Sequence, residues 1–170
     1  MPRYIALLRA VNVGGTGTLP MAKLKSMCVD AGFGRVETYI ASGNVVLDSK
    51  ATPSRVKAEL EARLLALAGK PVGVVVRTAR EMAAVHRGNP FRKAEPKYTY
   101  VVFLDRRPPR DALEHAVGQR GEEMRLGDRE IFIHYPSGMG RSKLKIPAAR
   151  SGTARNMNTV AKLAEIAAKT

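Results

Sequence analysis

The sequence holds one cysteine and no tryptophan, and only 5% of its residues are aromatic. Cys28 therefore cannot form a disulfide within the chain, and no Cys/His cluster has the spacing of a zinc site. We expect neither a metal nor a cofactor. A chain this poor in cysteine suits a reducing compartment, so we expect a cytoplasmic protein in which Cys28 packs as a small buried hydrophobe.

Long apolar runs are also absent. The longest purely apolar stretches are short, such as Ile5–Leu8 and Val74–Val76, and none is long enough to span a bilayer. Residues 1–3 lead directly into a strand-like segment, without the apolar region and cleavage site of a secretory signal. We therefore expect a protein with no membrane association.

Acidic residues are scarce in comparison with basic ones. Asp and Glu number 15 against 29 Lys and Arg, which gives a formal net charge of +14. This excess allows an anionic partner, such as a phosphate-bearing ligand or a nucleic acid, without identifying one. It is spread evenly between the two halves, but Ile131–Ala164 contains no acidic residue. The basic residues of that stretch are Arg141, Lys143, Lys145, Arg150, Arg155 and Lys162.

The apolar residues, 45% of the total, are enough for a globular core, and their spacing predicts the secondary structure of the first half. Glycine and proline mark the expected boundaries, and Pro20 and Gly32 suit the start and end of a helix. The predicted order is β-α-β-β-α-β: a strand at Tyr4–Val13, the helix after Pro20, strands at Arg35–Ala41 and Asn44–Asp48, a helix at Pro53–Ala68 and a strand at Pro71–Arg77.

The second half partly repeats this order, with β-α-β-β-α and no obvious last strand. Its predicted elements are a short helix at Ala79–His86, a strand at Tyr98–Leu104, a helix at Pro108–Val117, strands at Met124–Leu126 and Glu130–Tyr135, and a helix at Asn158–Ala168. The fold class that follows is α+β: two ferredoxin-like α/β sandwich units in tandem, with antiparallel sheets and helices on one face. We place the units at residues 1–78 and 79–170.

Two loops of the first unit can carry a binding site. Residues 14–17 (GGTG) follow a strand and precede a helix, a layout in which backbone N–H groups bind phosphate, although they match neither the Walker A nor the GxGxxG pattern. A simple connecting loop is the alternative. The assumed topology brings Asn12, Gly14 and Gly15 close to Ser42 and Asn44. The turn at residues 42–44 either contacts a ligand or only closes a hairpin.

The second unit has a glycine-rich basic loop at Ser137–Lys143. Arg155 and the start of the last helix can hold a phosphate, with Arg141 and Lys143 nearby. In the alternative interpretation, the asparagines near residue 156 cap the helix and the basic residues form a solvated face. The candidate ligand-binding residues are therefore Asn12, Gly14, Gly15, Ser42, Asn44, Arg141, Ser142, Lys143, Arg155 and Asn156.

Catalytic patterns are weak. His86, His115 and His134 have no carboxylate or cysteine at the spacing of a metal site or a catalytic triad, so we expect surface or packing histidines. Three hypotheses remain open: a protein that binds an anionic ligand or nucleic acid, an enzyme acting on a small phosphorylated or carboxylated metabolite, and a dimerising structural or interaction protein.

Several motifs carry a resemblance to a known family. The segments ALLRAVNVGGTGTLPMAKLK, ASGNVVLDS, NPF, GRSKL and GTARNMNTVAKL resemble, in this order and over almost the whole chain, the domain-of-unknown-function 1697 family. The resemblance implies mostly bacterial proteins with tandem ferredoxin-like units and no established activity. Thr18 stands where relatives often carry a basic residue. Met157 replaces a frequent Trp, which removes an aromatic for stacking on a base.

Overall fold

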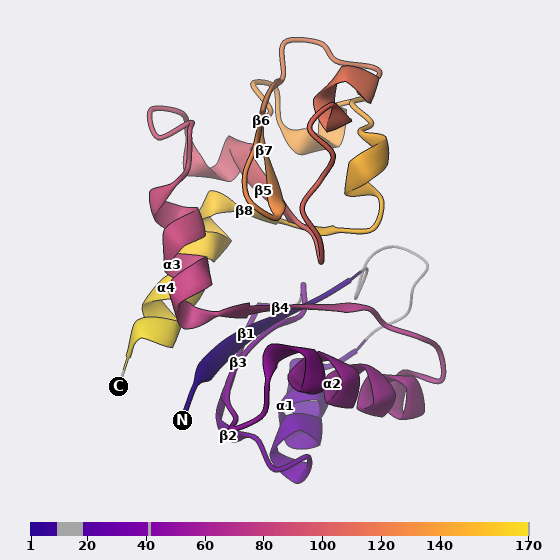
Figure 1. The fold of residues 1–170 in the computed structure, drawn as a ribbon, viewed down its shortest axis with the longest axis vertical. Coiled ribbons are helices and arrows are strands. Elements are labelled where there is room, and N and C mark those ends of the chain that lie inside the picture. Colours follow the sequence, from indigo (N-terminus) through magenta and orange to yellow (C-terminus); the bar gives the residue numbers. More distant parts are fainter. Residues whose placement is uncertain (10–18, 41, 170) are drawn as a thin grey trace. The chain divides into compact units, whose positions relative to one another are not determined.

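The computed structural model describes residues 1–9, 19–40 and 42–169, and it confirms an α+β protein with two antiparallel four-stranded sheets in tandem (Figure 1). The chain divides into two compact units. The first contains Met1–Met82 together with the C-terminal residues from Leu163 onward, and the second is Ala83–Lys162. No helix in the described ranges is long and apolar enough to cross a membrane.

The first sheet has the strand order β2-β3-β1-β4, which is the ferredoxin-like order that the sequence predicts. Its strands are β1 (Arg3–Leu8), β2 (Gly34–Tyr39), β3 (Asn44–Asp48) and β4 (Val74–Thr78), and its helices are α1 (Met21–Asp30) and α2 (Pro53–Ala68). The expected extension of β1 beyond residue 9 lies outside the described residues.

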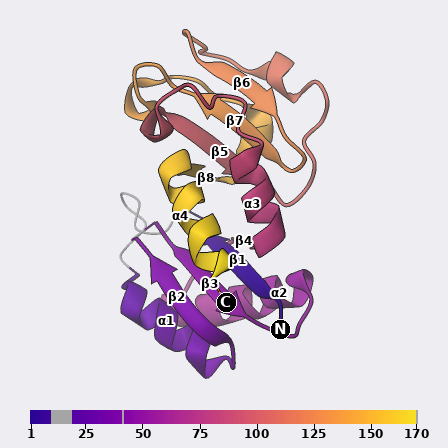
Figure 2. The same cartoon turned by 90° about the vertical axis from the view of Figure 1, so that its left-hand side faces the viewer.

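Helices α1 and α2 cover one face of the first sheet (Figures 1 and 2). Alternate residues of β1 point to this face, so Tyr4, Ala6 and Leu8 belong to the same buried cluster as Cys28 and Leu60. Cys28 has no exposed surface, and burial raises the pKa of its thiol to about 11. The prediction that Cys28 is a packing residue is therefore confirmed, because a thiol this hard to ionise is a poor nucleophile.

The opposite face of the first sheet is buried as well. Ile5 and Leu7 alternate with the residues that face the helices, and both are fully inaccessible. Val75 and Arg77 of β4 lie directly opposite Leu7 and Ile5 in the register, and they are also buried. Burial on both faces explains why these strands are continuous apolar runs rather than alternating ones.

A charged network joins β1, β2 and β3 at the end of this sheet. The Asp48 carboxylate accepts hydrogen bonds from Arg3 Nη1 at 2.9 Å and from Arg35 Nε at 2.6 Å, and Arg3 Nη2 donates to Glu37 at 2.9 Å. Burial opposes ionisation of Asp48, but the hydrogen bonds and charges of Arg35 and Arg3 outweigh it and hold its pKa below the ordinary value. Both Arg3 and Asp48 are buried, so each neutralises a charge that water cannot reach.

The second sheet has the equivalent order β6-β7-β5-β8. Its strands are β5 (Thr99–Phe103), β6 (Glu123–Leu126), β7 (Glu130–His134) and β8 (Thr153–Asn156). The sequence shows no apolar run at β8 because its four residues, TARN, are polar or small. Nevertheless it pairs with β5 in a continuous antiparallel register, from Tyr100 opposite Asn156 to Phe103 opposite Thr153. The second unit thus has the last strand that the sequence pattern lacks.

The helices of the second unit differ from the prediction. The expected helix at Pro108–Val117 is wrong except for one 3-10 turn, Ala112–His115, because the backbone is extended at Ala116 and Val117 pairs with Lys145 in a β-bridge. Two more 3-10 turns, Met139–Arg141 and Pro147–Ala149, lie between β7 and β8. Leu113, Leu144 and Ile146 from these connections pack on the sheet face formed by Val102, Ile131 and Ile133. Helices α3 (Ala79–Arg87) and α4 (Met157–Ala168) agree with the prediction.

Candidate functional site

A cavity of about 420 Å³ lies in the second unit, between the loop before β6 and the glycine-rich basic loop after β7. It contains three of the predicted ligand-binding residues, Arg141, Ser142 and Lys143. The other lining residues are Gly118, Gln119, Arg120, Glu122, Tyr135, Pro136, Ser137 and Gly138. The structure therefore places one part of the sequence-predicted set on a single concave surface.

Glu122 ties the two loops of this cavity together. Ser142 Oγ donates to Glu122 Oε2 at 2.5 Å, and the backbone N–H of Arg120 donates to Glu122 Oε1. These bonds, that of Ser142 first, hold the pKa of Glu122 below its ordinary value. Ser142 Oγ also accepts from the backbone N–H of Leu144 at 3.1 Å. Glu122 therefore remains ionised and fixes the position of the basic loop.

A second tie between the same segments is made by the backbone. Val117 and Lys145 form an isolated antiparallel bridge, in which each N–H donates to the other carbonyl at 2.9 and 2.8 Å. The next residue, Gly118, has a φ of +74°, and a Cβ built on it would lie 2.2 Å from the Lys143 carbonyl oxygen. Only glycine allows these two segments of the chain to approach this closely.

Three basic side chains surround the cavity: Arg120, Arg141 and Lys143. All three are exposed, and none forms an ion pair with any residue that the structure describes. The cavity lining contains one carboxylate, Glu122, whose oxygens already accept two hydrogen bonds. Burial, assisted by the charge of Glu122, raises the pKa of Tyr135 to about 12, so this lining phenol stays neutral. The cavity consequently carries an excess of positive charge.

The turn at residues 42–44 has a structural role. The Asn44 side chain has no exposed surface, and its Nδ2 donates to the Tyr39 carbonyl at 2.8 Å and to Ser42 Oγ at 2.9 Å. These bonds close the β2–β3 hairpin. Asn44 is therefore held inside the turn, which agrees with the hairpin interpretation of this motif.

The topological prediction for the first unit is supported as far as the described residues extend. The Leu8 N–H donates to the Gly43 carbonyl at 2.9 Å, so the end of β1 lies beside the β2–β3 turn. Asn12, Gly14 and Gly15 lie outside the described residues, and their predicted role as an anion-binding loop remains a prediction.

Arg155 and Asn156 lie on β8 and not in the cavity lining. Arg155 is 5% exposed, and its Nη1 donates to Thr153 Oγ1 at 2.6 Å and to the Ala154 carbonyl at 2.9 Å. Burial lowers the pKa of its guanidinium to about 10. Asn156 Oδ1 accepts from the Thr159 N–H at 3.0 Å, which is the helix-capping interpretation. Met157, where relatives often carry Trp, is buried, so this position contributes to packing.

Sequence reasoning did not include four residues that shape the cavity: Gly118, Gln119, Arg120 and Glu122. Gln119 Nε2 donates to the backbone carbonyl of Glu122 at 2.7 Å and thus stiffens this loop. The segment has a weak sequence signal, GQRGEE, in which two glycines with positive φ flank a basic residue. No group of three or more His, Cys, Asp or Glu residues in the described ranges could hold a metal ion.

Comparisons with known proteins agree with this fold. Over 99% of both chains, the structure superposes with a TM-score of 0.82 on a solved structure of a conserved bacterial protein from Streptococcus pneumoniae, with 24% sequence identity. At this identity the similarity supports the fold alone. No curated protein gave a significant match. The family model described as "Protein of unknown function (DUF1697)" matches residues 1–132, which is most of the chain, and the protein therefore belongs to the DUF1697 family.

Proposed function

We propose that the cavity between the 118–122 loop and the Ser137–Lys143 loop binds a small phosphate-bearing ligand. The observation that carries the proposal is the set of three exposed basic side chains, Arg120, Arg141 and Lys143, around one concave surface. A phosphate group accepts charge-assisted hydrogen bonds from guanidinium and ammonium groups, and these are stronger than bonds between neutral partners. The Ser137 hydroxyl lines the same cavity and can add a neutral donor.

The two loops that form the cavity are already held in place before a ligand binds. Glu122, Ser142 and the Val117–Lys145 bridge fix both loops through hydrogen bonds within the protein. Less conformational freedom is then lost when a ligand binds. The Glu122 carboxylate oxygens accept hydrogen bonds from Ser142 Oγ and from the Arg120 backbone N–H. Glu122 therefore holds the two loops together, and the basic side chains of the cavity stay available for a ligand.

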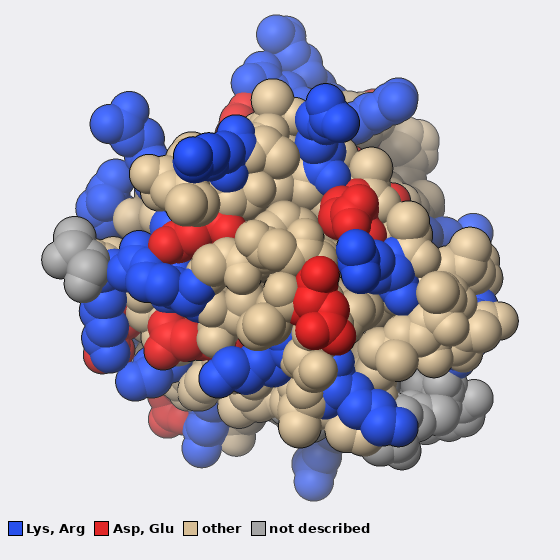
Figure 3. Space-filling model, turned by 90° about the horizontal axis from the view of Figure 1, so that it is seen from below, with Lys and Arg blue, Asp and Glu red and all other residues tan. Residues whose placement is uncertain are grey.

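The size of the cavity supports a small ligand better than a long nucleic acid. On the face shown in Figure 3, Lys and Arg side chains are scattered and interrupted by Asp and Glu, and they form no continuous basic strip. A nucleic acid that depends on phosphate contacts needs several basic residues aligned along its backbone. A cavity of about 420 Å³ instead has the size of a small-molecule site.

Titration calorimetry with inorganic phosphate and pyrophosphate at low ionic strength tests the proposal. The double variant Arg141→Ala/Lys143→Ala is expected to bind pyrophosphate at least about tenfold more weakly, because two charge-assisted bonds are lost. The matched control is Lys25→Ala/Arg55→Ala, which removes the same charge from exposed positions of the first unit. It should bind like the wild type. Equal weakening in both variants, or no binding by the wild type, would show that the cavity is not a phosphate site.

A further inference from the structure

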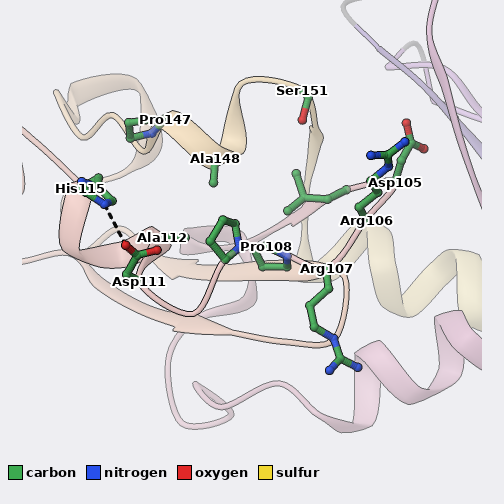
Figure 4. A pocket seen from close by; sticks show the side chains of 12 residues that line it. Asp105, Arg106, Arg107, Pro108, Asp111, Ala112, His115, Pro147, Ala148 and Ser151 are labelled. Carbon is green, nitrogen blue, oxygen red and sulfur yellow. Dashed lines mark hydrogen bonds and ion pairs between the residues drawn. The ribbon is translucent and has the colours of Figure 1, made fainter.

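A second cavity in the same unit has a different chemical character. Its volume is about 530 Å³, and it shares no lining residue with the basic cavity (Figure 4). It is formed by the segment that follows β5 and by the 3-10 turns at Ala112–His115 and Pro147–Ala149. The apolar part of its lining consists of Leu104, Pro108, Pro109, Ala112, Pro147 and Ala148.

The walls of this cavity are rigid and apolar. The three prolines have fixed backbone φ angles and offer aliphatic ring surfaces. Leu104, Pro108 and Ala112 are buried, so they are held in place by the rest of the unit. A preformed apolar cavity of this volume with a few polar groups is the usual form of a small-molecule site. Flat, weakly hydrated ring systems fit such walls best.

The polar groups lie at the ends of the cavity. His115 Nε2 and Asp111 Oδ2 are 3.2 Å apart, and Figure 4 shows this pair at the opposite end from Ser151 and Arg106. The Asp111 carboxylate oxygen accepts hydrogen bonds, so this contact favours the His115 tautomer with its hydrogen on Nε2. The other ring nitrogen, Nδ1, is then a hydrogen-bond acceptor.

The charged residues that line this cavity do not favour an anionic ligand. The Arg107 guanidinium pairs with Asp128 at 2.6 Å, and Figure 4 shows it pointing away from the prolines. The remaining charged lining residues include both signs: Arg106 together with Asp105 and Asp111. A neutral ligand therefore suits this lining better than a phosphate does.

We propose that this cavity binds a neutral nitrogen heteroaromatic ring that carries an N–H group, as indole does. The ring face packs against the prolines and Ala148, and the N–H donates to His115 Nδ1. This site is independent of the proposed phosphate site, because the two have no lining residue in common.

Saturation-transfer NMR tests the proposal, with indole as the probe and 1-methylindole, which lacks the N–H, as its matched analogue. The wild type should bind indole at millimolar concentration and 1-methylindole roughly fivefold more weakly, the effect of one neutral hydrogen bond. His115→Ala should weaken the binding of indole by a similar factor and remove the preference for indole over 1-methylindole. His86→Ala, which changes an exposed histidine outside this cavity, should bind like the wild type.

A second variant blocks the cavity instead of changing its polar end. Ala148→Trp places a large ring where the ligand is expected and should abolish indole binding; the chain has no other tryptophan, so fluorescence of the new side chain reports whether the variant is folded. If it fails to fold, His115→Ala carries the test alone. Absence of indole binding by the wild type, unchanged binding by a folded Ala148→Trp variant, or displacement of indole by inorganic phosphate would overturn the proposal.

Discussion

Asp48→Ala is expected to lower the free energy of unfolding by about 3 kcal/mol, because it leaves the buried Arg3 guanidinium with only the half-exposed Glu37 as a counter-charge. The Arg3 and Asp48 side chains are only 7% and 10% exposed, so water cannot replace the lost carboxylate. Arg3 Nε has no hydrogen-bond partner among the described residues, and without Asp48 the guanidinium keeps only its bonds to the Arg35 carbonyl and to Glu37. Urea unfolding at neutral pH, followed by circular dichroism, measures the loss.

The control for this substitution is a different ion pair in the same unit. Glu59 and Arg63 are 2.8 Å apart on α2, but both side chains are more than 40% exposed. Glu59→Ala should therefore cost only about 0.5 kcal/mol. Asp48→Asn keeps the size of the side chain and removes its charge, so it should lie between the two. Equal costs for Asp48→Ala and Glu59→Ala would contradict the role assigned to the buried network.

The pH dependence of the Asp48 effect has a definite sign. The folded state holds the pKa of Asp48 below the ordinary value of 3.8, so the carboxylate contributes its stability above that value. The contribution is lost as the pH falls through the lowered pKa of the folded state. The difference in stability between wild type and Asp48→Ala should therefore be constant above about pH 5 and shrink in more acidic solution. A difference that grows on acidification would contradict the assignment.

The elements that the sequence predicts best are those whose boundaries have local causes. Helix α2 begins after Thr52, whose side chain accepts from the Arg55 N–H, and it ends at Gly69 in the left-handed conformation. Its buried residues, Val56, Leu60 and Leu64, follow the helical spacing. By contrast, β8 has no apolar pattern of its own, and its position is determined by pairing with β5, about 50 residues earlier in the chain. A strand of this kind is not visible in the sequence of its own four residues.

The candidate site also depends on contacts between residues that are far apart in the sequence. Its basic residues are visible in the sequence because the Ser137–Lys143 loop is rich in glycine and charge. The bond from Ser142 to Glu122, however, spans 20 residues, and no periodicity links the two positions. Arg155 illustrates the same point from the other side: its residue type suggests a phosphate ligand, and the structure shows its side chain buried on β8, with Thr153 Oγ1 and the Ala154 carbonyl accepting its hydrogen bonds. Residue type indicated which chemistry was available, and only the strand and loop pairings decide which side chains reach solvent.

Gly118→Ala is expected to weaken the proposed phosphate site as much as the loss of Arg141 and Lys143 does, although it removes no charged or polar side chain. The new Cβ would lie 2.2 Å from the Lys143 carbonyl oxygen and 2.9 Å from its carbonyl carbon, and both belong to the backbone. The two segments must separate, which breaks the Val117–Lys145 bridge and displaces the loop that carries Arg141 and Lys143. We expect a loss of stability of about 3 kcal/mol, from the left-handed backbone and the steric overlap together, and at least about tenfold weaker pyrophosphate binding.

Gly121→Ala separates the cost of placing alanine in a left-handed backbone from the cost of the steric overlap with Lys143. Gly121 has a φ of +83°, close to the +74° of Gly118, but a Cβ built on it meets nothing within 4 Å. Both variants therefore carry the conformational cost of alanine with a positive φ, about 1 kcal/mol, and only Gly118→Ala adds the overlap with Lys143. Hydrogen exchange should become faster at the Val117 and Lys145 amides in Gly118→Ala and stay slow in Gly121→Ala. Retained protection of both amides in Gly118→Ala would show that the loop tolerates the side chain, and that the close approach at Gly118 does not position the basic residues.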